Sequence, residues 1–271
     1  MPMMNLLVAF NGSDGSVAAL RYAAALAERL GAHVTAILAH STHEVIDKRS
    51  RWIPKEARAL LEAANTHILR EIEARFEAER AAVGLTAALQ LREVTGRVDS
   101  ILSEAARHYD MLIVGRPSET DDEHVTLHPD RIALLSGRPV VVVPAGYDGG
   151  AALTHSALAW DGGRAAARAL SDSLRLLEDD GRVSVLTVGP RTSWPIEDLM
   201  THLSRHGVEA VLHEWPKAPS VAATLVAWCR EHQPSLLVLG AYEHSKFRED
   251  LLGGVTSEIL AQVDIPVLLS H

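Results

Sequence analysis

The chain has 271 residues, which is enough for two domains of about 150 residues each. Hydrophobic residues make up 47% of the chain and charged residues 23%, and this balance excludes a disordered or fibrous protein. The formal net charge of −9 argues against nucleic acid as a partner, because a duplex-binding groove needs a basic surface.

The sequence also predicts the compartment. No apolar run reaches the roughly 18 residues that suggest a membrane span, and no basic residue precedes the apolar stretch at residues 1–10, as it would in a secretory signal. Cys229 is the single cysteine, so an intrachain disulfide is impossible, and its helical surroundings predict a buried structural thiol. We therefore expect a cytoplasmic protein with no membrane partner.

The two halves of the chain repeat one pattern of strands and helices. Each begins with a short apolar strand, continues with a helix that ends at glycine, and then has a β-branched strand. In the first half these are residues 6–12, 17–30 and 33–39; in the second half they are 156–162, 164–180 and 183–189. The repeat predicts two units of the same fold in tandem.

The ends of the halves match as well. MLIVG (111–115) corresponds to LLVLG (236–240), and PVVVVP (139–144) corresponds to PVLLSH (266–271). Strands that are apolar on both faces are typical of a parallel sheet covered by helices on both sides. The sequence therefore predicts an α/β fold with two tandem doubly wound domains, each a five-stranded parallel sheet, with a boundary in the turn at 145–150 between domains 1–147 and 151–271.

The first half is longer by about 25 residues, as the shift between matching strands indicates. We expect the additional residues within 40–63, where they lengthen the connection into a helix at 56–82. This helix has an apolar stripe at i, i+3/i+4 spacing, which predicts one face packed on the core. The stripe consists of Leu61, Ala64, Ile68, Ile72 and Phe76.

Ligands of open α/β sheets bind beyond the carboxyl ends of the strands, where the strand order reverses. In the second half, Asp161, Val188 and Gly240 stand at such ends. The segment after Gly240 ends in Gly253-Gly254, directly before a predicted helix at 256–262. Backbone N–H groups exposed at a helix start bind phosphate, and a carboxylate at Asp161 can accept hydrogen bonds from a ribose hydroxyl or an adenine amine. Glycine pairs also occur as ordinary turns, and Asp161 as an ordinary helix cap.

In these residues the chain resembles the universal stress protein family in its tandem two-domain form. The resemblance covers nearly the whole chain and rests on Trp160-Asp161-Gly162-Gly163, on the loop after Gly240 and on the closing Pro-Val strand of each half. The family's nucleotide-binding members carry Gly, two residues, Gly, nine residues, then Gly-Ser or Gly-Thr. This chain keeps the spacing with Gly240, Glu243, Gly253 and Gly254.

Two of these four positions depart from the family's pattern. Glu243 stands in place of the second glycine, where a carboxylate would repel phosphate, and Gly254 replaces the hydroxyl residue, for which Thr256 offers a substitute. The resemblance implies binding of ATP or another adenine nucleotide, without a metal, in the second half. The residues implied to form the site are Asp161, Val188, Leu239, Gly240, Glu243, Gly253, Gly254, Val255 and Thr256.

The first half departs further. Asn11 takes the place of the aspartate, Arg116-Pro117-Ser118 follows Gly115 without a second glycine, and Thr126-Leu127 stands where the glycine pair would be. We therefore expect a degenerate domain that supplies interface and stability and has no nucleotide site. The nearby segment 117–130, with His124 and His128, is expected to be a solvated loop and not a metal site.

Three functions stay open at this point. The first is a cytoplasmic stress-response protein that binds an adenine nucleotide in its second half. The second is an interaction or scaffold protein of the same fold without a nucleotide, which Glu243 favours. The third is a slow ATPase or adenylate-transferring hydrolase; because the loop after Gly240 shows no obvious general base or Walker lysine, we expect no enzyme and no catalytic residue.

Assembly is suggested by the last strand of each half. The resemblance implies pairing through these strands, residues 139–144 and 266–271, and an uncovered apolar edge is prone to association. Pairing within the chain would give an intrachain pseudo-dimer, and a further homodimer and a protein partner of unknown kind stay open.

Overall fold

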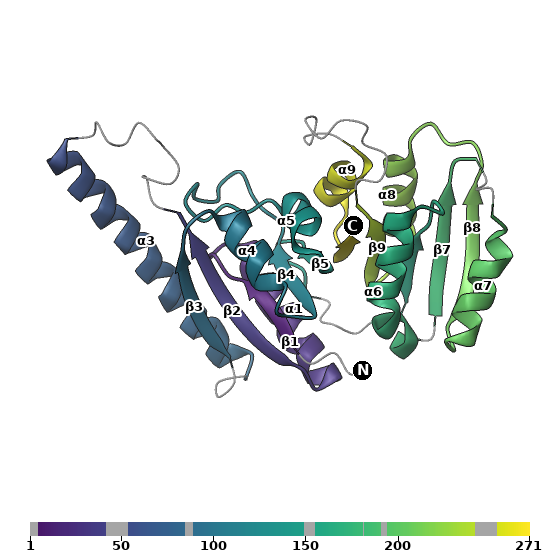
Figure 1. Ribbon diagram of the computed structural model, residues 1–271, viewed down its shortest axis with the longest axis horizontal. Helices are drawn as coiled ribbons and strands as arrows, with labels where there is room; N and C mark the ends of the chain where they lie inside the picture. The colour runs from purple at the N-terminus through teal and green to yellow at the C-terminus, as the bar shows by residue number, and fades with distance from the viewer. Residues whose placement is uncertain are drawn as a thin grey trace.

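The computed structural model describes residues 5–41, 54–84, 89–148, 155–180, 182–190, 194–241 and 254–271. It contains one mixed sheet of ten strands in the order β3-β2-β1-β4-β5-β10-β9-β6-β7-β8 (Figure 1). In the first half the strands are β1 (Asn5–Ala9), β2 (His33–His40), β3 (Gln90–Thr95), β4 (Met111–Gly115) and β5 (Val140–Val143). In the second half they are β6 (Ser156–Ala159), β7 (Arg182–Val188), β8 (Glu209–Trp215), β9 (Leu236–Gly240) and β10 (Val267–Ser270).

Within each half the five strands are parallel, as predicted. The halves join where β5 and β10 pair antiparallel, with Val141 opposite Leu268. The pairing of the two last strands within one chain is confirmed, and it turns two sheets into one. The domain boundaries themselves stay a prediction, because residues 149–154 lie outside the described part of the chain.

The helices form a layer on each face of the sheet. The helices of the first half are α1 (Asp14–Leu30), α3 (Lys55–Ala82), α4 (Val98–Ala106) and α5 (Pro129–Ser136); those of the second are α6 (Arg164–Asp180), α7 (Ile196–Arg205), α8 (Val221–His232) and α9 (Val255–Gln262). Buried residues of α1, α3, α6 and α7 share one core cluster. Those of α4, α5, α8 and α9 share the other. Neighbouring residues of one strand, such as Leu6 and Leu7, belong to opposite clusters, because strand side chains alternate between the faces.

Helix α3 differs from the prediction in how much of it is packed. Its C-terminal part is anchored by Ile72 and Phe76, which are 5% and 1% exposed. Toward its N-terminus Ala64 is exposed and Leu60 is 73% exposed, and Figure 1 shows this end extending beyond the sheet. The predicted stripe therefore faces the core only in its second half. Part of the extra length of the first half is helix, since α3 has 28 residues and its counterpart α7 has 10.

The glycine that ends the fourth strand of each half has a packing role. A Cβ on Gly115 would lie 2.2 Å from the carbonyl carbon of Gly15 in α1, and a Cβ on Gly240 would lie 2.4 Å from the carbonyl carbon of Ala165 in α6. No side chain fits at such distances from backbone, so glycine is required for α1 and α6 to cross these strands closely. Gly240 by itself is therefore no sign of a nucleotide site.

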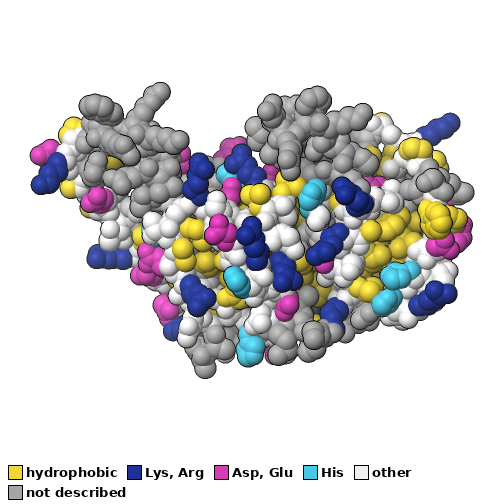
Figure 2. Space-filling model, viewed as in Figure 1, with side chains coloured by type: hydrophobic (Ala, Val, Ile, Leu, Met, Phe, Trp, Pro, Cys, Tyr) yellow, Lys and Arg dark blue, Asp and Glu magenta, His cyan; other side chains and the backbone are white. Residues whose placement is uncertain are grey.

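The described residues include no helix that is both apolar enough and long enough to cross a bilayer. On the face shown in Figure 2, basic and acidic side chains of the described residues are interspersed over both halves. Cys229 is buried as predicted, and burial raises the pKa of its thiol to about 12, which makes it a poor nucleophile.

Three histidines surround Trp228 on the outer part of the second half. His232 stacks on Trp228 with ring centroids 4.3 Å apart, while His213 and His155 approach the same indole edge-on at 5.3 and 5.9 Å. Burial lowers the pKa of His155, with Arg182, His232 and His213 acting in the same direction. Burial and the neighbouring His232 also lower the pKa of His213.

These shifts predict that the fold loses stability in mild acid. A histidine whose folded-state pKa lies below its unfolded value of 6.5 contributes stability that is complete above pH 6.5 and is lost as the pH falls through the folded pKa. The variant His213→Phe keeps a ring beside Trp228 but has no imidazole to protonate. Between pH 7.5 and 5.5 we expect its free energy of unfolding to fall by about 0.5 kcal/mol less than that of the wild type, a figure that allows for solvent screening. Urea unfolding at both values measures it, with exposed His67→Gln as the control. An identical pH dependence in His213→Phe would contradict it.

Candidate functional site

The carboxyl ends of three neighbouring strands in the second half bring together the predicted site. The strand order reverses between β6 and β9, whose residues Leu158 and Val238 lie opposite each other. Asp161 follows β6, Val188 ends β7 and Gly240 ends β9. Because parallel strands end at the same edge of a sheet, these positions lie at one edge, where open α/β sheets have their ligand crevice.

Asp161 also forms a turn of its own. Its Oδ1 accepts a hydrogen bond from the backbone N–H of Gly163 at 2.8 Å, and Gly162 between them has φ 78°, where glycine is favoured. The side chain of Asp161 is exposed. One carboxylate oxygen thus organises the entrance to α6, and the same exposed carboxylate stands over the crevice.

The start of helix α9 is built without a side-chain cap. Gly254 is its N-cap residue, and its extended backbone, φ 168°, is one that any residue adopts. A Cβ there would meet no atom within 4 Å. Glycine is therefore not required by the turn, and its effect is to leave the first N–H groups of α9 without the hydroxyl that commonly caps a helix.

The other predicted site residues have different surroundings. Thr256 is 5% exposed and Leu239 is 4% exposed, so their side chains are in the core, whereas Val255 is 41% exposed. Val188 is half-buried. Glu243 and Gly253 lie outside the described residues.

The first half contains the same turn after its first strand, with the amide of Asn11 in place of the carboxylate. Asn11 Oδ1 accepts from the backbone N–H of Ser13 at 3.1 Å and from its hydroxyl at 2.7 Å, and Gly12 has φ 79°. Unlike a carboxylate, the amide of Asn11 also donates, from Nδ2 to the carbonyl of Val125 at 3.3 Å. The residue that corresponds to Asp161 is thus fully used within the protein.

Segment 122–128 is packed over the strand ends of the first half. The hydroxyl of Ser41 and its N–H both donate to the carbonyl of His124, at 3.1 and 2.7 Å, and Val125 is 3% exposed. His128 is held by Asp99 through its backbone N–H and its Nδ1, both at 2.9 Å. The prediction of a solvated loop is wrong here, because this polar stretch hydrogen-bonds to Ser41, directly after β2, and to Asp99 of α4, and it buries Val125 and Leu127.

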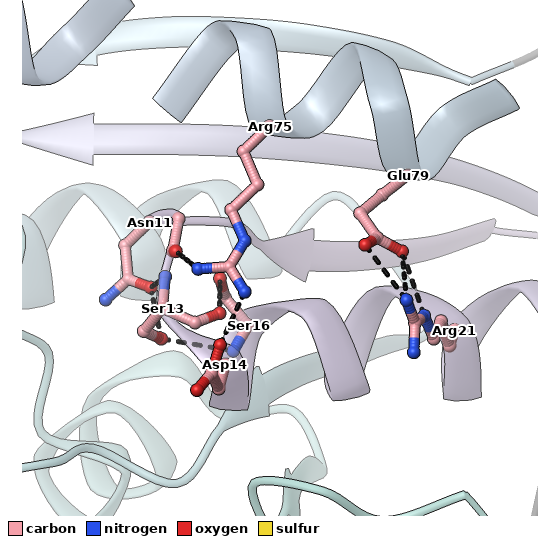
Figure 3. Close-up of polar contacts among 8 residues, drawn as sticks. Asn11, Ser13, Asp14, Ser16, Arg21, Arg75 and Glu79 are labelled. Carbon is pink, nitrogen blue, oxygen red and sulfur yellow. Dashed lines mark hydrogen bonds and ion pairs between the residues drawn. The ribbon is translucent and has the colours of Figure 1, made fainter. Parts of the chain in front are cut away.

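A cavity of about 460 Å³ remains beside this segment, at the N-terminus of α1. Arg75 of α3 crosses it, donating to the carbonyl of Gly12 at 2.6 Å and to Asp14 Oδ1 at 2.5 Å (Figure 3). One helical turn on, Glu79 binds Arg21 through two hydrogen bonds of 2.9 Å. Ser13 caps α1 by accepting from the N–H of Ser16 at 3.1 Å.

The groups at this cavity that could recognise a ligand are engaged with one another. Arg75 neutralises Asp14, Asp122 accepts from the N–H of His124 at 2.8 Å, and Asp121 accepts from that of Ser118 at 3.1 Å. The described residues hold no group of three or more His, Cys, Asp or Glu that could bind a metal ion. Sequence reasoning missed the cavity because Arg75 lies 63 residues from Gly12 and reaches it only through the packing of α3 on α1.

Comparison with known proteins assigns the chain to a family. The profile of the Universal stress protein family matches residues 3–144 and 199–271, which is most of the chain. The chain belongs to the universal stress protein family. The expected fold and family are thereby confirmed, and the two matched segments support the tandem form.

Individual relatives agree with this assignment. Universal stress protein Slr1230 of Synechocystis sp. is 25% identical over 98% of this chain and 99% of its own. A universal stress protein from Archaeoglobus fulgidus has a similar structure, with a TM-score of 0.71 at 14% identity over 98% of this chain and 95% of its own. A functionally unknown protein from Pseudomonas aeruginosa follows at a TM-score of 0.59 and 14% identity, over 99% and 92% of the two chains. These structures support the fold alone.

The Asn11 contact predicts a cost for restoring aspartate in the first half. Asn11→Asp keeps the acceptor for Ser13 but loses the donor to Val125, so a part-buried carbonyl is left unpaired beside a new negative charge. We expect the free energy of unfolding to fall by about 1–2 kcal/mol, measured by urea denaturation. Asp161→Asn, the reverse change in the second half, is the matched control and should lose little. Equal stability of Asn11→Asp and the wild type would contradict the role of this bond.

Proposed function

We propose that this universal stress protein binds an adenine nucleotide in its second half. The observation that carries the proposal is that Asp161, Val188 and Gly240 lie at the carboxyl ends of three neighbouring strands, where the strand order reverses. Helix α9, which follows β9 along the chain, begins at Gly254 without a side-chain cap. A carboxylate at this edge of the sheet and a helix that begins without a side-chain cap suit a ligand with hydroxyls at one end and phosphate at the other.

The residues have separate roles in this proposal. The N–H groups at the start of α9 donate to phosphate oxygens, helped by the positive end of the helix dipole. The exposed carboxylate oxygen of Asp161 accepts from a ribose hydroxyl or the adenine amine. Val188 offers an apolar surface to the base, and Leu239, with its side chain buried, contributes backbone only.

The first half supports the proposal by contrast. Its corresponding turn uses Asn11 to hold segment 122–128 in place, and its helix α1 is capped by Ser13. In the second half Gly163 stands where Ser13 stands and has no side chain to cap α6. The two halves thus hold the same backbone turn differently: Asn11 and Ser13 hold it in the first half, and the carboxylate of Asp161 holds it in the second. We propose that the protein acts by binding and not by catalysis, with the cytoplasm as its compartment.

Asp161→Asn is the sharpest test of the site. Asparagine keeps an acceptor for the N–H of Gly163, as Asn11 does in its own turn, while it removes the charge and replaces the other acceptor oxygen by a donor amide. Isothermal titration calorimetry with ATP, ADP and AMP should detect binding to the wild type and an affinity about tenfold or more weaker in the variant. Unchanged thermal stability of Asp161→Asn shows that the loss is local, and Asn11→Ala serves as the control in the first half. No heat with the wild type in any titration would overturn the proposal.

A second candidate, an interaction protein without a nucleotide, is favoured by Glu243 at the family's second glycine position. The two functions predict different results for Glu243→Gly. If the second half binds a nucleotide, removing a like charge from the phosphate loop should tighten existing binding by about tenfold. If the wild type binds nothing and Glu243→Gly creates binding, the protein works without a nucleotide. Calorimetry on both proteins at the same salt concentration distinguishes these results.

A further inference from the structure

Arg116 reaches from the first half into the second. It directly follows β4, and its backbone N–H donates to the carbonyl of Val143 at 2.7 Å, which fixes it at the end of β5. Its Nη2 donates to the carbonyl of Val263, the C-cap residue of α9. One side chain therefore connects the sheet of the first half to a helix of the second.

Helix α9 depends on other elements for its C-terminal end. The last carbonyls of a helix have no partner within it, and cations stabilise them because that end of the helix dipole is negative. The last turn of α9 contains no basic residue of its own. Two arginines from elsewhere supply the charge: Arg116 binds the carbonyl of Val263, and Arg230 of α8 binds that of Gln262 at 3.3 Å.

The contact with Val263 requires that the guanidinium of Arg116 be partly removed from water. Arg116 is partly buried, and burial lowers the pKa of its guanidinium, while the nearby Asp264 acts in the opposite direction. Its Nε is buried and has no hydrogen-bond partner among the described residues. An apolar side chain of similar length would fill the same space without desolvating a charge, so packing alone does not account for an arginine here.

The second half has no arginine at the position that corresponds to Arg116. Ala241 holds the corresponding place in the second half, since its N–H donates to the carbonyl of Ser270 at 2.8 Å as that of Arg116 does to Val143. An alanine cannot reach across the junction. The first half therefore holds a helix of the second half at this position, and the second half makes no equivalent contact there.

We infer that Arg116 is a positioning residue for the second half, holding α9 by its C-terminal end and thereby fixing the Gly254 end in the crevice. This inference rests on the proposed nucleotide site. Helix α9 has eight residues, so its ends are about 12 Å apart and a tilt at Val263 displaces the N–H groups that would bind phosphate. A two-turn helix has little stability by itself, which makes such an external anchor effective. The first half thus completes the site of its partner half.

The test compares three variants of the full chain. Arg116→Met removes the charge and the donor but keeps the bulk, and Arg116→Lys restores a donor and a charge. Arg107→Met is the matched control, because Arg107 donates in the same way, at 3.1 Å, to the carbonyl of Leu135 in the last turn of α5. Affinity for ADP is measured by calorimetry, and amide hydrogen exchange of residues 255–263 is measured without nucleotide.

We expect Arg116→Met to weaken ADP binding by about tenfold and to exchange the α9 amides faster than the wild type. Arg116→Lys should recover most of both, and Arg107→Met should match the wild type in both. Wild-type exchange in Arg116→Met, or faster exchange with unchanged ADP affinity, overturns the inference. A wild type that binds none of ADP, ATP and AMP overturns the proposed function instead, and the exchange measurement then decides alone whether Arg116 fixes α9.

Discussion

The antiparallel pairing of β5 with β10 is the interaction on which the rest of this structure depends. Each half alone would expose the edge of a short strand of four residues, all apolar except Ser270, and such an edge is prone to associate. Pairing the two edges satisfies the backbone of both strands and buries Val141 and Leu268 completely. Because the strands are central in the joined sheet, the segments that follow β4 and precede β10 are brought together, and Arg116 comes within reach of Val263.

The two halves have the same backbone frame but use it differently. Both place a glycine at the end of the fourth strand so that the first helix can cross it, and both have an Asx-type turn after the first strand. In the first half the turn residue is Asn11, whose amide can donate, and the donated bond holds segment 122–128 against the sheet. In the second half it is Asp161, which can only accept. A difference of one functional group thus changes what the turn can hold, since only the amide of Asn11 donates to segment 122–128.

This division gives each half a distinct role. The first half supplies rigidity through internal hydrogen bonds, through the Arg75–Asp14 and Arg21–Glu79 ion pairs, and through Arg116 across the junction. In the proposal the second half supplies the ligand site. In the same proposal the first half contributes to function without a site of its own, because its Arg116 holds the helix that carries the phosphate-binding N–H groups of the second half.

The sequence determined the repeat, the parallel strands of each half and the family, because apolar strand runs and closing glycines are local signals that survive in isolation. It also predicted Cys229 as buried. It did not reveal that segment 122–128 is packed, since its partners Asn11, Ser41 and Asp99 are 29 to 114 residues away, or that only the second half of the α3 stripe meets the core. Only the tertiary structure decided these points and the contact of Arg116 with Val263. Each of them depends on which residues, remote along the chain, the folded sheet places next to each other.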